Sequence, residues 1–251
     1  MSRIFILFAF LTTTFFIGGA THKSFPTNDL WKEDVLNKSN AGEEVFSHII
    51  DIAYDLYKPL ADMNNESLTI NKKWNDPTVN ANCSRFMGTV TINMFGGLFR
   101  RQEITPEGFA LVLCHEIGHA YGGTPYLSTW RKMSAEGQAD YYGAKDCHHN
   151  IMDKLNLQES EVGPLSFIDE TCDEHFTGKR YDTCVRGLQS GQSLANLLAT
   201  IKKEDQPSYL TPDPTVVNET LLSYPATIQC RLDTYYAGVL QQSRPLCWFK
   251  P

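Results

Sequence analysis

The sequence lacks several patterns that point to common classes of protein. It has no basic cluster, and its formal net charge is −7 over 251 residues, so we do not expect a nucleic-acid partner. No internal repeat and no low-complexity tract stand out. Beyond the N-terminus it has no apolar run of about 20 residues, the length that crosses a bilayer, so the mature chain is expected not to span a membrane. The composition is that of an ordinary globular protein.

The longest apolar run lies at the N-terminus. Arg3 precedes an uncharged, mostly apolar segment from Ile4 to Phe16, and the small residues Gly18-Gly19-Ala20 follow it. This order is typical of a secretory signal peptide, whereas a membrane anchor needs a longer run. We therefore predict a signal peptide over residues 1–20, a single domain over residues 21–251, and a secreted or periplasmic location.

Cysteine pairs with the Cys-x-x-Cys spacing of zinc sites are also missing. The chain has seven cysteines, and in an oxidising compartment disulfides are the default expectation. Because seven is odd, at least one thiol stays unpaired within the chain. We predict that it is Cys114, which lies in an apolar helix where a free cysteine packs as a small hydrophobe. The sequence does not choose the connectivity of the other six: Cys83, Cys147, Cys172, Cys184, Cys230 and Cys247.

The most informative stretch is His115-Glu116-Ile117-Gly118-His119, a His-Glu-x-x-His string. On a helix, His115 and His119 lie on one face, one turn apart. Two imidazoles in that arrangement can bind one zinc ion, and Glu116 lies beside them, placed to act on a zinc-bound water. The string is short, so the rest of the chain must supply the remaining parts of a site.

The helix that carries this string has clear boundaries. Thr105 is a good N-cap, Pro106 suits the first helical position, and Glu107 favours the positive end of the helix dipole. Gly122-Gly123 stops the pattern. We predict a buried helix from Pro106 to Tyr121, the rigid support that a metal site needs.

The chain before this helix predicts a helix and then a small sheet. Residues 21–40 are polar and are expected to form a loose lead-in, and the apolar spacing that follows predicts an amphipathic helix over residues 41–57 ending near Pro59. Residues 68–95 are rich in β-branched side chains and predict a small, mostly antiparallel sheet. The alternation in residues 89–94 indicates a half-buried strand, which either pairs by an exposed edge with an extended substrate or is purely structural.

A second helix is predicted from Ser134 to Cys147. Glu136 and Asp140 share one face of it, and the small residues around them suit close packing against another helix rather than a solvated acidic face. Farther along, apolar spacing predicts helices over residues 189–202 and 228–238.

A catalytic zinc takes three protein ligands and leaves a place for water. A third histidine six residues after His119 would complete one known pattern, but Pro125 stands there. Glu136, which follows His119 by 17 residues, leaves room for a turn and a second helix and is our predicted third ligand. Asp140, one turn later, is then placed to hold the ring N–H of a ligand, and we expect His115 as its partner.

These motifs resemble the gluzincin peptidases, and among them the CAAX-prenyl-protease-like family. The His-Glu-Ile-Gly-His string is followed by Glu136-Gly-Gln-Ala-Asp140. Asn80-Ala81 and Gly97-Leu98 stand before it in the family's order. The resemblance covers residues 78–143 well and residues 223–238 weakly. It implies an α+β, zincin-like fold in which the active-site helix packs on a second helix that carries the third ligand.

The same resemblance extends to the end of the chain. The family often has a Thr-His-Pro segment and an arginine several residues later, and Tyr224-Pro225 and Arg231 are similar to these, with Tyr224 in place of the histidine. By this resemblance, Tyr224 and Arg231 are candidates to stabilise the transition state. Three further candidates from the chain itself are His148, His149 and His175.

We therefore expect a secreted endopeptidase with one zinc ion bound by His115, His119 and Glu136, acting on a protein or peptide. Glu116 would take the proton of the attacking water and pass it to the departing amine. The alternative is a disulfide-bonded binding or structural protein with a degenerate or structural zinc site. A zinc hydrolase acting on peptidoglycan cross-links is a third possibility. The sequence does not indicate an oligomeric state.

Overall fold

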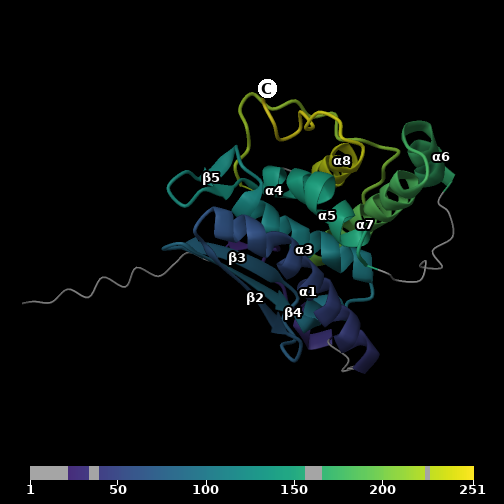
Figure 1. Cartoon of the computed structure of the whole chain (residues 1–251). Helices are drawn as coiled ribbons and strands as arrows, with labels where there is room; N and C mark the ends of the chain where they lie inside the picture. Colours follow the sequence, from purple (N-terminus) through teal and green to yellow (C-terminus); the bar gives the residue numbers. More distant parts are fainter. Residues whose placement is uncertain (1–21, 34–39, 156–165, 224–226) are drawn as a thin grey trace, which may run out of the picture.

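The computed structural model describes residues 22–33, 40–155, 166–223 and 227–251. Its elements form an α+β arrangement in which a small sheet and helix α1 lie on one side of the long helix α3, and the later helices lie on the other (Figure 1). The predicted signal peptide, Tyr224 and Pro225 lie outside the described residues.

The main sheet has four strands in the order β1-β3-β4-β2, with bounds His22–Lys23, Ala81–Phe86, Thr89–Phe95 and Ser67–Lys73 respectively. The pairs β1–β3 and β3–β4 are antiparallel, but the long pair β2–β4 is parallel. The sheet is therefore mixed, whereas a mostly antiparallel one was predicted. Thr78 and Val79, which have strand-like composition, lie in the connection between β2 and β3.

Alternation along the strands separates a buried face from a polar one. Val90, Ile92 and Met94 of β4 are fully buried. On the opposite face, Asn71, Asn93 and Asn82 form a row across three strands, with amide hydrogen bonds of 2.9 and 2.7 Å. The period of two read from residues 89–94 therefore gave the correct assignment of this strand.

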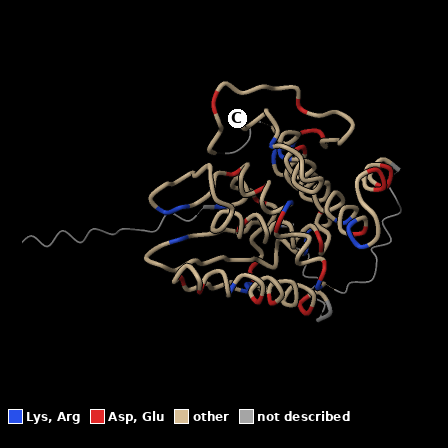
Figure 2. The backbone as a smooth tube through the Cα atoms, turned by 45° about the horizontal axis from the view of Figure 1, so that its top comes forward, with Lys and Arg blue, Asp and Glu red and all other residues tan. Residues whose placement is uncertain are grey.

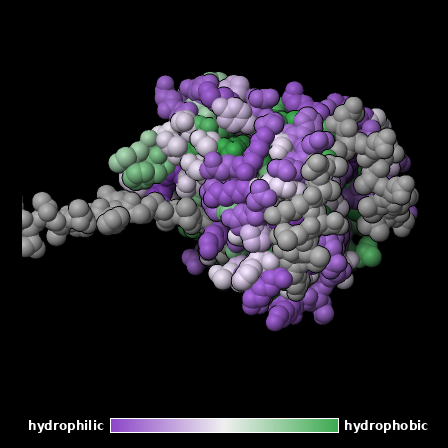
Figure 3. All heavy atoms as spheres, turned by 90° about the horizontal axis from the view of Figure 1, so that it is seen from below, coloured by the Kyte–Doolittle hydropathy of each residue, from purple (hydrophilic) through white to green (hydrophobic). Residues whose placement is uncertain are grey.

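Helix α1, Asn40–Met63, is longer than the predicted helix over residues 41–57. It continues through Pro59, which is exposed to solvent. The carbonyl that loses its helical partner at this proline can therefore be hydrated, so the break costs less than it would in a buried turn. The face of the molecule seen from below, where α1 lies in Figure 1, is mostly hydrophilic (Figure 3).

Helix α3 has the predicted bounds, Pro106–Tyr121. Thr105 is its N-cap, and its hydroxyl accepts a 3.0 Å hydrogen bond from the Gly108 amide. Every residue from Glu107 to Ala120 is buried, because α3 packs against α1, β3, α4, η2 and α7. A helix buried on all sides is held in place by every neighbouring layer, so its side chains have little freedom to shift.

The predicted second helix is built from three consecutive pieces: α4, Glu136–Tyr142; a π-helical turn, η2, Gly143–Cys147; and α5, His148–Met152. It starts two residues later than predicted because Ser134 belongs to strand β6, Met133–Ser134, which pairs with β5, Tyr126–Ser128. The small residues do allow close packing. A Cβ on Gly118 would lie 2.6 Å from the Ala139 carbonyl oxygen, so α3 and α4 touch through their backbones.

The remaining elements are three short helices, η1, α2 and α6, and the two helices α7 and α8, which pack against each other. They are η1, Leu30–Glu33; α2, Gly96–Phe99; α6, Ser166–His175; α7, Lys179–Lys202; and α8, Ile228–Val239. Helix α7 begins ten residues before the predicted start at residue 189. Lys and Arg are scattered along the described backbone among Asp and Glu (Figure 2). No described helix is both long and apolar enough to cross a membrane.

Three disulfides join the described elements, and one of them contradicts the sequence prediction. Cys114 is bonded to Cys147, with a Cα–Cα distance of 5.5 Å, and the unpaired cysteine of the described chain is Cys83. The prediction of a free Cys114 was wrong because η2 lies directly on α3 and brings Cys147 to it. The other two disulfides are Cys172–Cys184 and Cys230–Cys247.

The disulfide between α3 and η2 gives a first prediction. Replacing Cys114 and Cys147 together with alanine should lower the free energy of unfolding by about 3–4 kcal/mol, because the bond closes a long loop in the unfolded chain. If His115 is a metal ligand as predicted, the change should also weaken zinc binding, since Cys114 precedes His115. The double alanine variant of Cys172 and Cys184 is the control: it should be destabilised yet bind zinc as the wild type does. Urea unfolding and zinc titration measure both effects, and equal loss of zinc affinity in the two variants would contradict this account.

Candidate metal centre

His115, His119 and Glu136 come together at the contact between α3 and α4. Their ligand atoms all lie within 4.8 Å of one another. The two Nε2 atoms are 3.1 Å apart, and the Glu136 carboxylate oxygens lie 3.4 Å from His115 Nε2 and 3.6 Å from His119 Nε2. All three side chains are at most 1% exposed. The three residues that the sequence marked as ligands therefore form one buried cluster.

Hydrogen bonds at Nδ1, the ring nitrogen that does not face the cluster, fix the orientation of the His115 and His119 rings. His115 Nδ1 donates to Asp140 Oδ1 at 2.7 Å, and His119 Nδ1 donates to the Ser134 carbonyl at 2.9 Å. A carboxylate and a carbonyl accept only, so each Nδ1 carries a proton, and each Nε2 is the ring atom that faces the other ring and Glu136. A cation among these three groups would accept a lone pair from each deprotonated Nε2.

The spacing of these donors fits a zinc ion. Ligands about 2.0–2.1 Å from a tetrahedral zinc lie about 3.3 Å from one another, close to the measured separations of 3.1, 3.4 and 3.6 Å. Two imidazoles and one carboxylate form a ligand set that suits zinc, whereas calcium and magnesium prefer oxygen alone. The cluster can therefore hold a metal ion, and its donors favour zinc.

Asp140 is itself held by two residues of α8. Arg231 donates to both of its carboxylate oxygens at 2.8 and 2.7 Å, and the Tyr235 hydroxyl donates to Oδ1 at 3.1 Å. Burial alone would raise the pKa of Asp140, but the Arg231 guanidinium and His115 outweigh it and hold the pKa of this carboxyl well below its usual range. Asp140 is therefore a charged acceptor that orients His115. Arg231 contacts the site chiefly through Asp140.

Glu116 lies on the same helix and is fully buried. Burial, reinforced by the Glu136 charge, raises its pKa well above the ordinary value. Its Oε1 accepts a hydrogen bond from the Ser24 hydroxyl. The sequence did not indicate Ser24, because residues 21–40 look like a polar lead-in. It gave no sign of the roles of Tyr235 or of the Ser134 carbonyl either, since both depend on contacts between distant elements.

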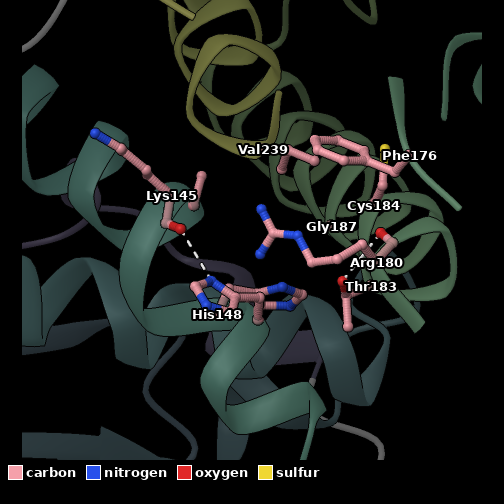
Figure 4. Close-up of a pocket in the computed structure, with 10 residues that line it drawn as sticks. Lys145, His148, Phe176, Arg180, Thr183, Cys184, Gly187 and Val239 are labelled. Carbon is pink, nitrogen blue, oxygen red and sulfur yellow. Dashed lines mark hydrogen bonds between the residues drawn. The ribbon is translucent and has the colours of Figure 1, made fainter. Parts of the chain in front are cut away.

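The other candidate histidines lie away from the cluster. His148 is buried between α3 and α7, where its Nε2 lies 3.1 Å from both the Glu107 carbonyl and the Ser190 hydroxyl. His148 and His149 help to line a pocket between η2, α5, α7 and α8 that is also lined by Arg180 (Figure 4). His175 Nδ1 bonds to a carbonyl of its own helix. None of these contacts involves the metal-binding cluster, since α5 carries His148 and His149 and α6 carries His175.

A second group of potential ligands, Asp213 with Cys230 and Cys247, does not make a metal centre. The two sulfurs are bonded to each other, and a disulfide offers no thiolate to a metal.

With this geometry established, the chain was compared with known proteins. No family model matches it, and no similar protein was found among curated proteins or among solved structures. The case for a function therefore depends on the cluster itself.

The contact behind His115 gives a second prediction. Asp140→Asn should weaken zinc binding about 10- to 100-fold, because an amide holds the ring N–H less strongly than a carboxylate does. Competition with a colour-forming chelator measures the affinity, and circular dichroism verifies that the variant is folded. Asp173→Asn, an exposed change on α6, is the control and should bind zinc normally. An unchanged affinity in folded Asp140→Asn would show that this contact does not support the metal.

Buried His148 gives a third prediction. Burial lowers its pKa to about 4, whereas an unfolded histidine titrates near about 6.5. Below pH 6.5 the unfolded chain takes up a proton that the folded chain does not, so the stability that His148 provides is full above this pH and is lost as the pH falls toward 4. Across that window the loss is about 3 kcal/mol.

Zinc-free wild type and His148→Gln should therefore differ in the slope of unfolding free energy against pH between 6.5 and 4, with the variant flatter. His175→Gln is the control and should keep the slope of the wild type. Parallel curves for the wild type and His148→Gln would contradict the assignment of this slope to His148.

Proposed function

We propose that this protein is a zinc-dependent endopeptidase of the gluzincin type, with a zincin-like arrangement of α3 and α4. The observation that carries the proposal is the position of Glu116. It is a buried carboxylate next in sequence to His115, beside a cluster of two histidines and one glutamate whose donor atoms converge. Metal-assisted peptide hydrolysis uses this combination of a metal with an open position and a nearby base.

Each residue has a distinct part in the proposed reaction. His115, His119 and Glu136 would hold the zinc, which would supply a Lewis acid for the scissile carbonyl and lower the pKa of water. Glu116 accepts a proton from the attacking water and returns it to the departing amine. Asp140 fixes the His115 ring, and Arg231 and Tyr235 fix Asp140. Tyr224 remains a candidate for stabilising the transition state, as does Arg231.

The described ligand set favours catalysis over a structural role. Structural zinc sites usually have four protein ligands, whereas three residues form the group found in the described part of the chain. A structural or binding protein would also have no use for Glu116, whose burial is costly unless it serves a purpose. A hydrolase that cuts peptidoglycan cross-links would use the same residues and differ only in substrate.

A secreted or periplasmic location is part of the proposal. Three disulfides among the described residues support it, since such bonds persist in oxidising compartments. The predicted signal peptide over residues 1–20 is the other support.

The fourth prediction tests the proposed base. Glu116→Gln should bind zinc as tightly as the wild type but lose at least about 100-fold in hydrolysis of a denatured protein or a peptide library, the usual contribution of a general base. Glu174→Gln, an exposed change on α6, is the control and should keep full activity. In the wild type, chelation should abolish hydrolysis and zinc should restore it. Glu116→Gln that cleaves at the rate of the wild type would refute the assignment.

A further inference from the structure

The first described residues lie along the outer edge of β3, next to the metal centre. His22 and Lys23 pair antiparallel with Cys83 and Asn82 as strand β1. The Ser24 amide continues the ladder with a 3.1 Å bond to the Ala81 carbonyl. The purple start of the described chain is seen beside β3 in Figure 1. This edge is the outer one on that side of the sheet, because β4 is paired on both of its sides. The expectation that an extended substrate would pair with residues 89–94 was therefore wrong: among the described strands β4 lies between β3 and β2, and β1 covers the other edge of β3.

Ser24 reaches the groups that are assigned to catalysis. Its hydroxyl donates to Glu116 Oε1 and lies 3.2 Å from the Ala81 carbonyl oxygen. Its own carbonyl oxygen lies 3.5 Å from Arg231 Nη1. The Ser24 hydroxyl therefore contacts the carboxylate that is proposed to accept a proton from the reacting water. The Ser24 backbone is hydrogen-bonded to β3, at the edge with which an extended substrate chain would pair.

Phe25 anchors this segment. Its side chain is 1% exposed and belongs to the main hydrophobic core. Its amide donates to Asn80 Oδ1 at 3.1 Å, and its carbonyl accepts from Asn80 Nδ2 at 3.0 Å. Ser24 is also 1% exposed. Because Ser24 covers Glu116, and the zinc ligands beside it are at most 1% exposed, no substrate reaches the site in this state.

We propose that residues 22–25 occupy the substrate position on the β3 edge, so that the described structure is a latent form which must release this segment before a peptide can bind. The proposal rests on the proposed function, because it takes Glu116 and the zinc ligands as the machinery that is covered. The occupant is a segment of this chain, bound in the manner in which an extended peptide adds a strand to a sheet edge. A peptide that replaces it would form the same ladder with β3.

The test weakens the segment in the full zinc-loaded chain and measures two quantities. Phe25→Ala removes the anchor, and Ser24→Gly removes the hydroxyl contacts. Thr27→Ala, an exposed change in the same stretch, is the control. The first quantity is the rate at which a chelator removes zinc, which reports access to the site without any catalysis. The second is kcat/KM for a long peptide substrate.

Both rates should rise by at least about tenfold in Phe25→Ala, because losing a buried phenylalanine side chain shifts the equilibrium strongly toward the open state. Ser24→Gly should change them in the same direction, and Thr27→Ala should leave them as in the wild type. A synthetic peptide with the sequence of residues 21–27 should inhibit Phe25→Ala competitively, whereas a scrambled peptide should not. Should Phe25→Ala fail to fold, Ser24→Gly decides the question.

The outcomes separate this proposal from the proposed function. If the wild type shows Glu116-dependent hydrolysis and neither variant changes zinc release or kcat/KM, the segment is a structural strand and the latent form is refuted, while the peptidase stands. If zinc release rises in the variants but none of them hydrolyses any substrate, the segment does cover the site and the peptidase assignment fails. Lower rates in both variants would also refute the latent form.

Discussion

The balance of buried charge at the junction of α3, α4 and α8 is the constraint on which the rest of the structure depends. Glu116, Glu136 and Asp140 are all fully buried, and Arg231 is the cation that pairs directly with Asp140. If all four groups are ionised, their formal charges sum to −2. Isolated charges in a protein interior are very costly unless they are paired or bind a metal. A divalent cation between His115, His119 and Glu136 would bring that sum to zero and would favour the ionised form of Glu116, whose pKa is otherwise raised well above its usual range by burial and by the Glu136 charge.

The fold holds this arrangement by bringing helix backbones unusually close together. A Cβ at Gly143 would lie 3.1 Å from the Cys114 backbone, and one at Gly118 would meet Ala139 still more closely. At these two places the absence of a side chain lets α4 and η2 lie directly on α3. The Cys114–Cys147 disulfide then fixes the contact covalently beside His115. Ligand geometry of this kind requires positions accurate to a fraction of an ångström, which close backbone packing provides.

The parts of the molecule that the sequence predicts well are those decided by local chemistry. The bounds of α3 follow from Thr105, Pro106 and Gly122, and the ligand cluster follows from spacings within two helices. What the sequence did not predict depends on contacts between distant elements. Cys114 was misassigned because its partner is reached only once η2 packs on α3. The parallel pairing of β2 and β4 has no signature in either strand alone.

The N-terminal stretch is the most instructive failure, because its composition is polar and yet Ser24 and Phe25 are buried. Two residues of strand and one aromatic ring cannot be recognised as an element by periodicity. Their position depends on pairing with the edge of β3, and this edge exists only once the sheet has folded. A strand edge is a template for any extended chain, so the β3 edge that pairs with this segment could pair in the same way with another extended peptide.

In the proposed latent form, access to the site depends on the competition between residues 22–25 and a peptide for the β3 edge. A peptide that displaces residues 22–25 exchanges one set of β3 hydrogen bonds for another, and such an exchange contributes little net free energy. The segment is tethered to the chain, which gives it a high effective concentration that a free peptide must overcome. The difference between the two occupants therefore lies in their side chains, and chiefly in what fills the buried position of Phe25. Two contacts hold the anchor: the Phe25 ring packs in the main hydrophobic core, and Asn80 bonds to the Phe25 backbone amide and carbonyl.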